Sequence, residues 1–233
     1  MNKKFTTLMY HNIKSEGDKF TVTKKQFLEQ LSVINKKDEK LFSLEKITFD
    51  DFGNIITFDD GFKSDLWAAK KLSEFGFTAT FFVVKDYALS NNSYLSENEI
   101  LEISELGHEI GVHGKSHAWW TSLNEKTLID DLSETKSWIE SLISKDVISC
   151  SAPGGKINNN VIKNLITSNL FKYIRISKPG LNYLDDKLIH SVPIYRSTNI
   201  EQYIKIINHN KSYFFKQKSI FLLKNQIKNL LDR

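Results

Sequence analysis

The stretch Ile55-Ile56-Thr57-Phe58-Asp59-Asp60-Gly61-Phe62 ends an apolar run with two adjacent carboxyl groups. The run is typical of a buried strand, and Gly61 marks the turn that follows it. Successive strand side chains point to opposite faces, and a glycine turn redirects the chain, so the two carboxyls are predicted to point in different directions. One can hold a metal ion while its neighbour accepts a proton.

A near copy of this motif, Thr48-Phe49-Asp50-Asp51, lies nine residues earlier. Gly53-Asn54 marks a turn after it, whereas the later copy follows an apolar run that delivers Asp59 and Asp60 to the carboxyl end of a strand. We therefore place the site at the later copy.

The segment His113-Gly114-Lys115-Ser116-His117 supplies two imidazoles. Their spacing of four places both rings on one side of a helical turn or a tight loop. Hydrolytic metal sites use three ligands drawn from His, Asp and Glu and leave one position for water. Either motif alone is common as a surface turn or a solvated helix face. Together they favour Asp60, His113 and His117 as metal ligands.

Composition indicates one soluble, enzyme-sized domain. The chain has 233 residues, of which 40% are hydrophobic and 26% charged, enough for one sizeable core. A net charge of +4 does not favour nucleic acid as the main partner, and no nucleic-acid-reading motif occurs. Cys150 is the only cysteine, which excludes an internal disulfide, and its apolar surroundings predict a buried strand thiol.

Residues 211–233 differ in character from the rest of the chain. They carry six basic residues and one acid, with apolar residues at helical spacing. We expect a catalytic domain over 1–210 and a basic amphipathic helix over 211–233, packed on the body or lying on a membrane surface or partner. The N-terminus has no signal-length apolar run, and nothing approaches the ~20 apolar residues of a spanning helix. The expected location is the cytoplasm, with peripheral contact at the inner face of the membrane as an extension.

Apolar strand-like runs and helical patterns alternate along the chain, which predicts an α/β fold with a mainly parallel sheet. Helix starts are marked by capping boxes that begin at Thr23, Ser96 and Thr198, and helix ends by Gly76 and Gly107. In such folds the chemistry gathers at the carboxyl ends of strands. The seven expected strands lie near residues 5–10, 54–58, 78–84, 109–113, 147–152, 172–176 and 188–194.

Three linked motifs, at residues 58–62, 76–83 and 107–117, resemble the polysaccharide deacetylase (NodB-homology) family, carbohydrate esterase family 4, and the similarity covers roughly residues 5–205. The resemblance implies a distorted (β/α)7 barrel and metal-dependent removal of an acyl group from a sugar. It implies that Asp59 is the general base and that Asp60, His113 and His117 bind the metal. The implied metal is Zn²⁺, with Co²⁺, Ni²⁺ or Mn²⁺ as alternatives.

The later motifs depart from the family pattern. Ser151-Ala152-Pro153-Gly154-Gly155 lacks the arginine that many members use to brace the base. Arg175, in the next strand, either replaces it or is an ordinary strand-end arginine. The family's fourth, Asp-rich motif is not visible near Lys178. His190 is the candidate general acid, with a metal-bound water or His11 as alternatives.

Substrate contacts are expected from residues near the carboxyl ends of the strands. Adjacent Trp119 and Trp120 cannot both be buried on one helix face, so at least one is expected to stack on a sugar. His11 is either a substrate contact or a structural histidine bonded to a backbone carbonyl. The full expected set is Trp119, Trp120, Pro153, Gly154, Arg175 and His11.

The function predicted is removal of the N-acetyl group from an N-acetylated sugar, in a glycan or in a nucleotide- or lipid-linked precursor. Two alternatives stay open. One is a deformylase or other amidase acting on a sugar-linked amide. The other is a catalytically inactive glycan-binding homologue, suggested by the absent arginine and the uncertain acid.

Overall fold

The structure is a computed structural model that describes residues 3–48 and 53–231. Residues 49–51 of the near copy lie outside the described part. The later copy, at the end of β4 (Asn54–Phe58), lies inside it.

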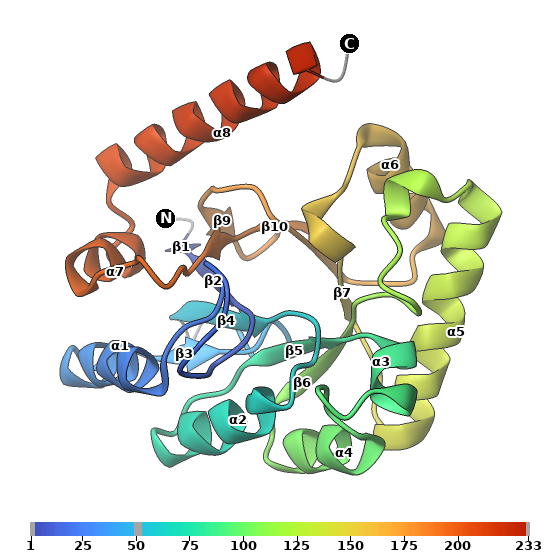
Figure 1. Cartoon of the computed structure of the whole chain (residues 1–233), viewed down its shortest axis with the longest axis horizontal. Coiled ribbons are helices and arrows are strands. Elements are labelled where there is room, and N and C mark those ends of the chain that lie inside the picture. The colour runs from blue at the N-terminus through green and yellow to red at the C-terminus, as the bar shows by residue number, and fades with distance from the viewer. Residues whose placement is uncertain (1–2, 49–52, 232–233) are drawn as a thin grey trace.

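Parallel strands form a nearly closed barrel, drawn in the middle of Figure 1. The last strand of the barrel is divided into two short strands. The first, β10 (Leu188–His190), pairs with β8, and the second, β11 (Val192–Pro193), pairs with β2. If β10 and β11 are counted as one strand, the described residues form a seven-stranded barrel, as predicted. The other six, in order round the barrel, are β2 (Thr7–Tyr10), β4, β5 (Thr80–Val83), β6 (Glu109–Val112), β7 (Ser149–Ser151) and β8 (Tyr173–Ile176).

Helices surround the barrel and follow its strands in the chain (Figure 1). They are α1 (Lys24–Lys36), α2 (Ser64–Glu74), α3 (Lys85–Ser90), α4 (Glu97–Glu105), α5 (Glu125–Ile143), α6 (Asn159–Ser168) and α7 (Ile200–Ile207). Short 3₁₀ turns occur at Trp120–Ser122 and Pro153–Gly155. The remaining short strands are β1 (Lys4–Phe5), β3 (Leu41–Phe42) and β9 (Asn182–Tyr183).

Capping chemistry sets the helix boundaries. Ser96 forms a capping box with Glu99, as predicted. Thr23 caps α1, but the predicted box is incomplete, because the side-chain amide of Gln26 donates to the Thr198 carbonyl instead of returning to Thr23. The third prediction is wrong by one residue, because Asn199 caps α7 and pairs reciprocally with Gln202. The Thr198 hydroxyl instead accepts a hydrogen bond from the Tyr195 amide at 2.9 Å, in the turn before the helix.

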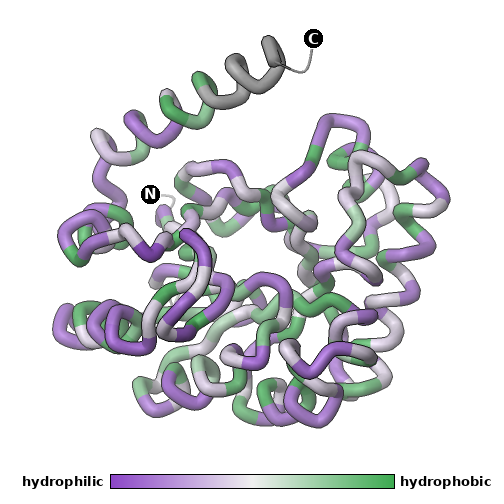
Figure 2. Tube along the Cα trace, in the orientation of Figure 1, coloured by the Kyte–Doolittle hydropathy of each residue, from purple (hydrophilic) through white to green (hydrophobic). Residues whose placement is uncertain are grey.

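Two apolar clusters divide the strand side chains by parity. Ile56 and Phe81 belong to the cluster shared with the surrounding helices, whereas Ile55 and Phe82 belong to a second cluster without residues from the described helices. Figure 2 shows the apolar residues concentrated along the central strands. Gly111 also occupies an interior position, where an added Cβ would lie 2.5 Å from the Phe82 ring. Every second residue of each strand therefore faces the barrel interior.

Helix α8 (Lys211–Leu231) follows α7 and lies on the side of the barrel that carries β9 and β10 (Figure 1). Phe214 is buried in the main apolar cluster, whereas Phe215 is 76% exposed. Cys150 is buried in β7, as expected. None of the helices in the described ranges is both long and apolar enough to cross a membrane.

Candidate active site

The end of β4 separates the two acidic residues. The Asp59 amide donates to the Tyr10 carbonyl at 3.0 Å, so Asp59 still continues the strand and takes an interior position. Asp60 then adopts a left-handed conformation with φ of 76°, and Gly61 follows with φ of 70°. A non-glycine residue at positive φ is strained, and such strain is typical of functional sites. The turn redirects the Asp60 carboxylate toward the histidines, as the sequence predicts.

The two histidines reach Asp60 from one loop. The His113 amide donates to Val83 at 2.9 Å and extends the pairing of β5 and β6. His113 Nδ1 lies 2.8 Å from the Ser151 carbonyl, and this contact requires the proton on Nδ1. The Nε2 atom then has a lone pair with which it can bind a metal ion. His117, at φ of 61°, ends the tight loop that brings its ring beside that of His113.

Asp60, His113 and His117 fit a divalent cation. Asp60 Oδ1 lies 3.2 Å from His113 Nε2 and 3.1 Å from His117 Nε2, and the three donor atoms lie within 4.8 Å of one another. Two ligands on one zinc ion at about 2.0–2.1 Å are themselves about 3 Å apart. Burial alone would raise the pKa of Asp60, but the two imidazoles beside it outweigh burial and hold this pKa well below its ordinary value. The carboxylate is therefore ionised, as a metal ligand must be.

Asp59 forms a buried ion pair with Arg175. The Arg175 side chain has no exposed surface and donates Nη2 to Asp59 Oδ2 and to the Ser151 hydroxyl. Its Nη1 donates to the hydroxyls of Ser177 at 2.9 Å and Ser191 at 3.3 Å. Arg175 was expected to contact substrate, but it lies behind Asp59 and braces it. The arginine absent beside Ser151 is thus supplied by the next strand.

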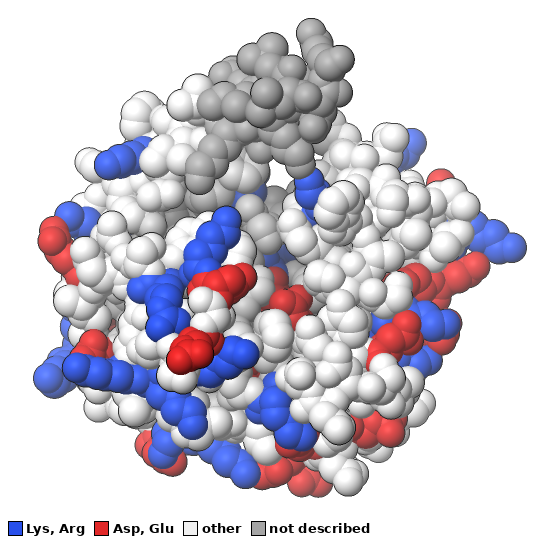
Figure 3. Space-filling view, in the orientation of Figure 1, with Lys and Arg blue, Asp and Glu red and all other residues white. Residues whose placement is uncertain are grey.

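One oxygen of Asp59 remains available. Asp59 Oδ1 has no hydrogen-bond partner within the described part of the chain, and Asp59 lines a cavity at the strand ends. This cavity has a volume of about 700 Å³ and also exposes Asp60, His113 and His117. Figure 3 shows a hollow in the middle of this face, with acidic side chains inside it. The free carboxylate oxygen can accept a proton from a molecule in the cavity.

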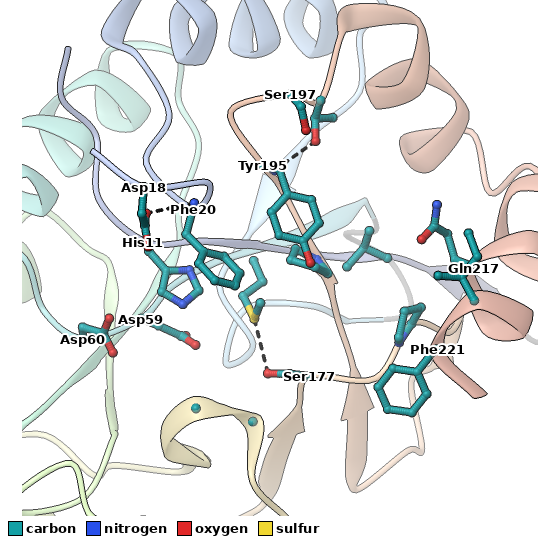
Figure 4. Close-up of a pocket in the computed structure, with 18 of the residues that line it drawn as sticks. His11, Asp18, Phe20, Asp59, Asp60, Ser177, Tyr195, Ser197, Gln217 and Phe221 are labelled. Atoms are coloured by element: carbon teal, nitrogen blue, oxygen red, sulfur yellow. Dashed lines mark hydrogen bonds between the residues drawn. The ribbon is translucent and has the colours of Figure 1, made fainter. Parts of the chain in front are cut away.

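His11 reaches the same cavity from the end of β2. Its ring centre lies 4.7 Å from that of Phe20, and its buried Nδ1 has no hydrogen-bond partner among the described residues. The described contacts therefore do not support the alternative in which His11 is a structural histidine bonded to a backbone carbonyl. Burial lowers the pKa of His11, although the charges of Asp59 and Asp60 act in the opposite direction. Figure 4 shows His11 beside both carboxylates.

His190 lies outside the cavity. Ile189 and Ser191, on either side of it, take interior positions: Ile189 packs in the inner cluster and Ser191 contacts Arg175. His190 therefore points to the other face of its strand, where Nδ1 lies 3.1 Å from the Lys178 carbonyl. This position does not support the predicted role of His190 as the general acid, because the alternation of side chains along the strand turns its ring away from the cavity.

Of the other residues expected to contact substrate, two are buried and two are accessible. Trp120 is 1% exposed and belongs to the main core, and Pro153 is buried, so neither offers a surface to a sugar. Gly154 lines the cavity. Trp119 is 54% exposed and stacks under the Lys156 ammonium at 4.9 Å, beside Gly154. Trp119 and Gly154 are thus the two that remain accessible.

Sequence reasoning missed much of the cavity wall. Tyr195 lies two residues after the end of β11, so the strand-end rule could have found it, but Phe20 lies in a loop without a sequence signal. The spacing of apolar residues in 211–233 predicted a helix, but nothing in the sequence indicated which of its faces reaches the cavity. The missed residues include Asp18, Phe20, Ser177, Tyr195, Tyr213, Gln217, Ile220 and Phe221.

A seven-stranded parallel barrel with this Asp-Asp-His-His arrangement at the carboxyl ends of its strands defines a class of barrel hydrolases. Comparison with known proteins agrees. A sequence model of the polysaccharide deacetylase family matches residues 46–170, and the chain belongs to this family. A peptidoglycan-N-acetylglucosamine deacetylase from Bacillus cereus is 31% identical over 111 residues, which are 46% of this chain and 49% of that protein. The chain therefore aligns with about half the length of this relative.

Solved structures support the same fold. The Streptococcus pyogenes deacetylase PplD aligns with a TM-score of 0.79 at 16% identity, over 89% of this chain and 99% of the other. A polysaccharide deacetylase from Bacillus cereus aligns with a TM-score of 0.75 at 24% identity, over 88% of this chain and 69% of the other. At these identities the likeness establishes the barrel, and the chemistry depends on the residues of this chain.

Proposed function

We propose that this protein removes the N-acetyl group from an N-acetylated sugar in a glycan or glycan precursor, with a divalent cation held by Asp60, His113 and His117. The observation that carries the proposal is the position of Asp59. It stands next to the metal-binding triad at the wall of the cavity, with Oδ2 bonded to Arg175 and with Oδ1 buried and without a partner among the described residues. Family membership supports the reaction class, and the donor set of two imidazoles and one carboxylate suits Zn²⁺, Co²⁺, Ni²⁺ or Mn²⁺.

The residues of the chain divide the work of amide hydrolysis. A cation bound by the triad would polarise the acyl carbonyl and acidify water. Asp59 Oδ1 takes the proton of the attacking water, and Arg175 holds the carboxylate in this orientation. The same proton then returns from Asp59 to the leaving nitrogen. His11, on the same wall of the cavity, orients the acyl group.

Metal content measured beside turnover tests this proposal. We expect about one divalent ion per chain in the wild type and its loss in His113→Ala, because that substitution removes one of three ligands. Acetate release from N-acetylated sugar oligomers should disappear with the metal. Formyl and other acyl derivatives assayed in parallel distinguish a deacetylase from another amidase. A metal-loaded protein that binds sugar without turnover would contradict the proposal and identify a glycan-binding homologue.

The cytoplasm remains our proposed location, and a nucleotide or lipid carrier on the sugar remains a prediction. Peripheral membrane contact through residues 211–233 is also part of the proposal. It is supported by Phe215, Leu222 and Leu223, which are at least half exposed on α8 beside lysines. Sedimentation with anionic vesicles tests it, and recovery of all the protein in the supernatant would rule it out.

A further inference from the structure

The loop that follows β6 carries two of the three metal ligands and has no regular secondary structure over residues 113–117. The His113 amide still donates to Val83 in β5, but the position of His117 depends on the path of the three residues before it. A metal site needs its ligand atoms held to within about 0.5 Å of their binding geometry. The contacts that fix the path of this loop therefore decide whether both imidazoles reach one cation.

Helix α3 holds one side of this loop through its first backbone amides. The Lys85 amide donates to the Gly114 carbonyl at 3.3 Å. The next amide, of Asp86, donates to the Lys115 carbonyl at 2.9 Å. The first amides of a helix have no partner inside the helix, which leaves them available to bind other groups. Since these bonds join backbone atoms, they do not depend on a particular side chain of α3.

A side chain of α5 holds the other side of the loop. Asp131 Oδ1 accepts a hydrogen bond from the Lys115 amide at 3.0 Å, midway between the two histidines. Gly114 allows this close approach, because a Cβ added to it would lie 3.5 Å from Asp131 Oδ1 and 3.3 Å from Trp120 Nε1. Asp131 is partly buried, whereas its neighbour Asp130 is exposed. The backbone between the metal ligands is thus bonded to a carboxyl group that lies 16 positions further along the chain.

Charged side chains cross the same junction at the surface, where α3 and α5 lie side by side (Figure 1). Glu134 of α5 accepts hydrogen bonds from Lys85 at 2.8 Å and from Lys115 at 3.0 Å. Its side chain is 46% exposed, and exposed ion pairs contribute little because water and salt screen them. Glu134 thus contacts a side chain of the loop, whereas Asp131 binds its backbone.

We propose that Asp131 is a positioning residue for the metal site, and that its bond to the Lys115 amide holds the loop in the path that brings both histidines to Asp60. The inference rests on the proposed function for the presence of a divalent cation at this triad. It assigns control of metal affinity to α5, a helix that contributes no residue to the described lining of the cavity.

The test is the dissociation constant of Zn²⁺, measured by competition with a chromophoric chelator on the full chain after its metal has been removed. Asp131→Ala should raise this constant about tenfold, because contacts that orient metal ligands are worth about 10–100-fold in affinity. Asp131→Asn should change it by no more than about twofold, since the amide oxygen still accepts the Lys115 N–H. Recovery by asparagine separates the hydrogen bond from the negative charge.

Two variants of α5 serve as controls. Asp130→Ala removes an exposed aspartate from the adjacent position, and Glu134→Gln weakens the exposed ion pairs to the same loop. Neither should change the affinity for Zn²⁺. Hydrogen exchange of the Lys115 amide gives a second readout that needs no metal. This amide should exchange faster in Asp131→Ala than in Asp130→Ala, because it has lost its acceptor.

Denaturant unfolding and acetate release in the same samples separate the possible outcomes. If Asp131→Ala is less stable but binds Zn²⁺ like Asp130→Ala, Asp131 is only structural and the inference is overturned, while the deacetylase stands. If Asp131→Asn binds Zn²⁺ as weakly as Asp131→Ala, the hydrogen bond is not the cause, and the inference is overturned as well. If Zn²⁺ binds the wild type, binds Asp131→Ala more weakly and supports no acetate release, the inference stands and the proposed function fails.

Discussion

Asp59 and Glu109 lie at opposite ends of the barrel and are equally buried, since each residue is 3% exposed. Asp59 follows the carboxyl end of β4 and pairs with the buried Arg175. Glu109 begins β6 at the amino end, where Oε2 accepts hydrogen bonds from the Thr80 hydroxyl at 2.7 Å and the Glu45 amide at 2.9 Å. No cation pairs with Glu109 among the described residues.

The two carboxyl groups are equally buried, but they differ in their partners. At the catalytic end the Arg175 guanidinium pairs with the Asp59 carboxyl group. At the amino end, burial raises the pKa of Glu109 to about 7, since hydroxyl and amide donors offset only part of the cost of ionisation. The carboxyl end of the barrel thus has an acid paired with a cation. At the amino end, the hydrogen bonds of Glu109 connect β5 and β6 to the loop that carries Glu45.

Asp59→Asn should have the largest effect. An amide cannot accept the proton of the attacking water, and we expect kcat/KM to fall by about 10²–10⁴-fold while metal content is retained. Acetate release and elemental analysis of the same sample measure both quantities. Glu109→Gln is the matched control with equal burial, and its kcat/KM should remain near that of the wild type. Equal losses in the two variants would remove the distinction between the two ends.

Arg175→Met should destabilise the fold by about 3–5 kcal/mol, because it leaves the Asp59 carboxylate buried without its partner. Denaturant unfolding measures the loss. In the Asp59→Asn/Arg175→Met double variant, part of the stability should return, since the uncompensated charge is gone. Arg196→Met, which removes an exposed arginine, provides the control. Additive losses in the double variant would show that the pair is not coupled.

Glu109→Gln should alter how stability depends on pH. The folded state holds the Glu109 proton until about pH 7, whereas the unfolded chain releases it near 4.5. The stability from the protonated group is therefore complete below pH 4.5 and lost as pH rises through 7, a change of about 3 kcal/mol. The stability of Glu109→Gln relative to the wild type should thus increase over this interval in urea unfolding. The exposed Glu105→Gln should show no such trend, and a constant difference for Glu109→Gln would refute the assignment.

His190→Gln should have the smallest effect. Its ring points away from the interior, and we expect kcat/KM to change by no more than about twofold. His11→Gln, at the cavity wall, should reduce kcat/KM clearly more than that. Steady-state kinetics of the two variants ranks them, and the reverse order would return His190 to the catalytic group.

Local patterns predicted much of this molecule. Alternating strands and helices, with the apolar run before Asp59, indicated an α/β fold with a mainly parallel sheet, and the motif resemblance implied the barrel. The same patterns placed Asp59, Asp60 and His113 at the carboxyl ends of strands, because both strand parity and the turn at Gly61 are properties of adjacent residues. The same parity could have excluded His190, which lies between two interior positions of one strand. The motif resemblance added the metal-binding role and the reaction class.

The sequence by itself determined the strands of the barrel, the acids and histidines that end them, and the helical character of residues 211–233, since each depends on residues close together in the chain. Only the tertiary structure decided that Arg175 braces Asp59 across 116 positions, that Trp120 is core while Trp119 is exposed, and that α8 faces the cavity. Those relations depend on which strands become neighbours when the barrel closes and on how the last helix returns over it. No spacing within one segment encodes them.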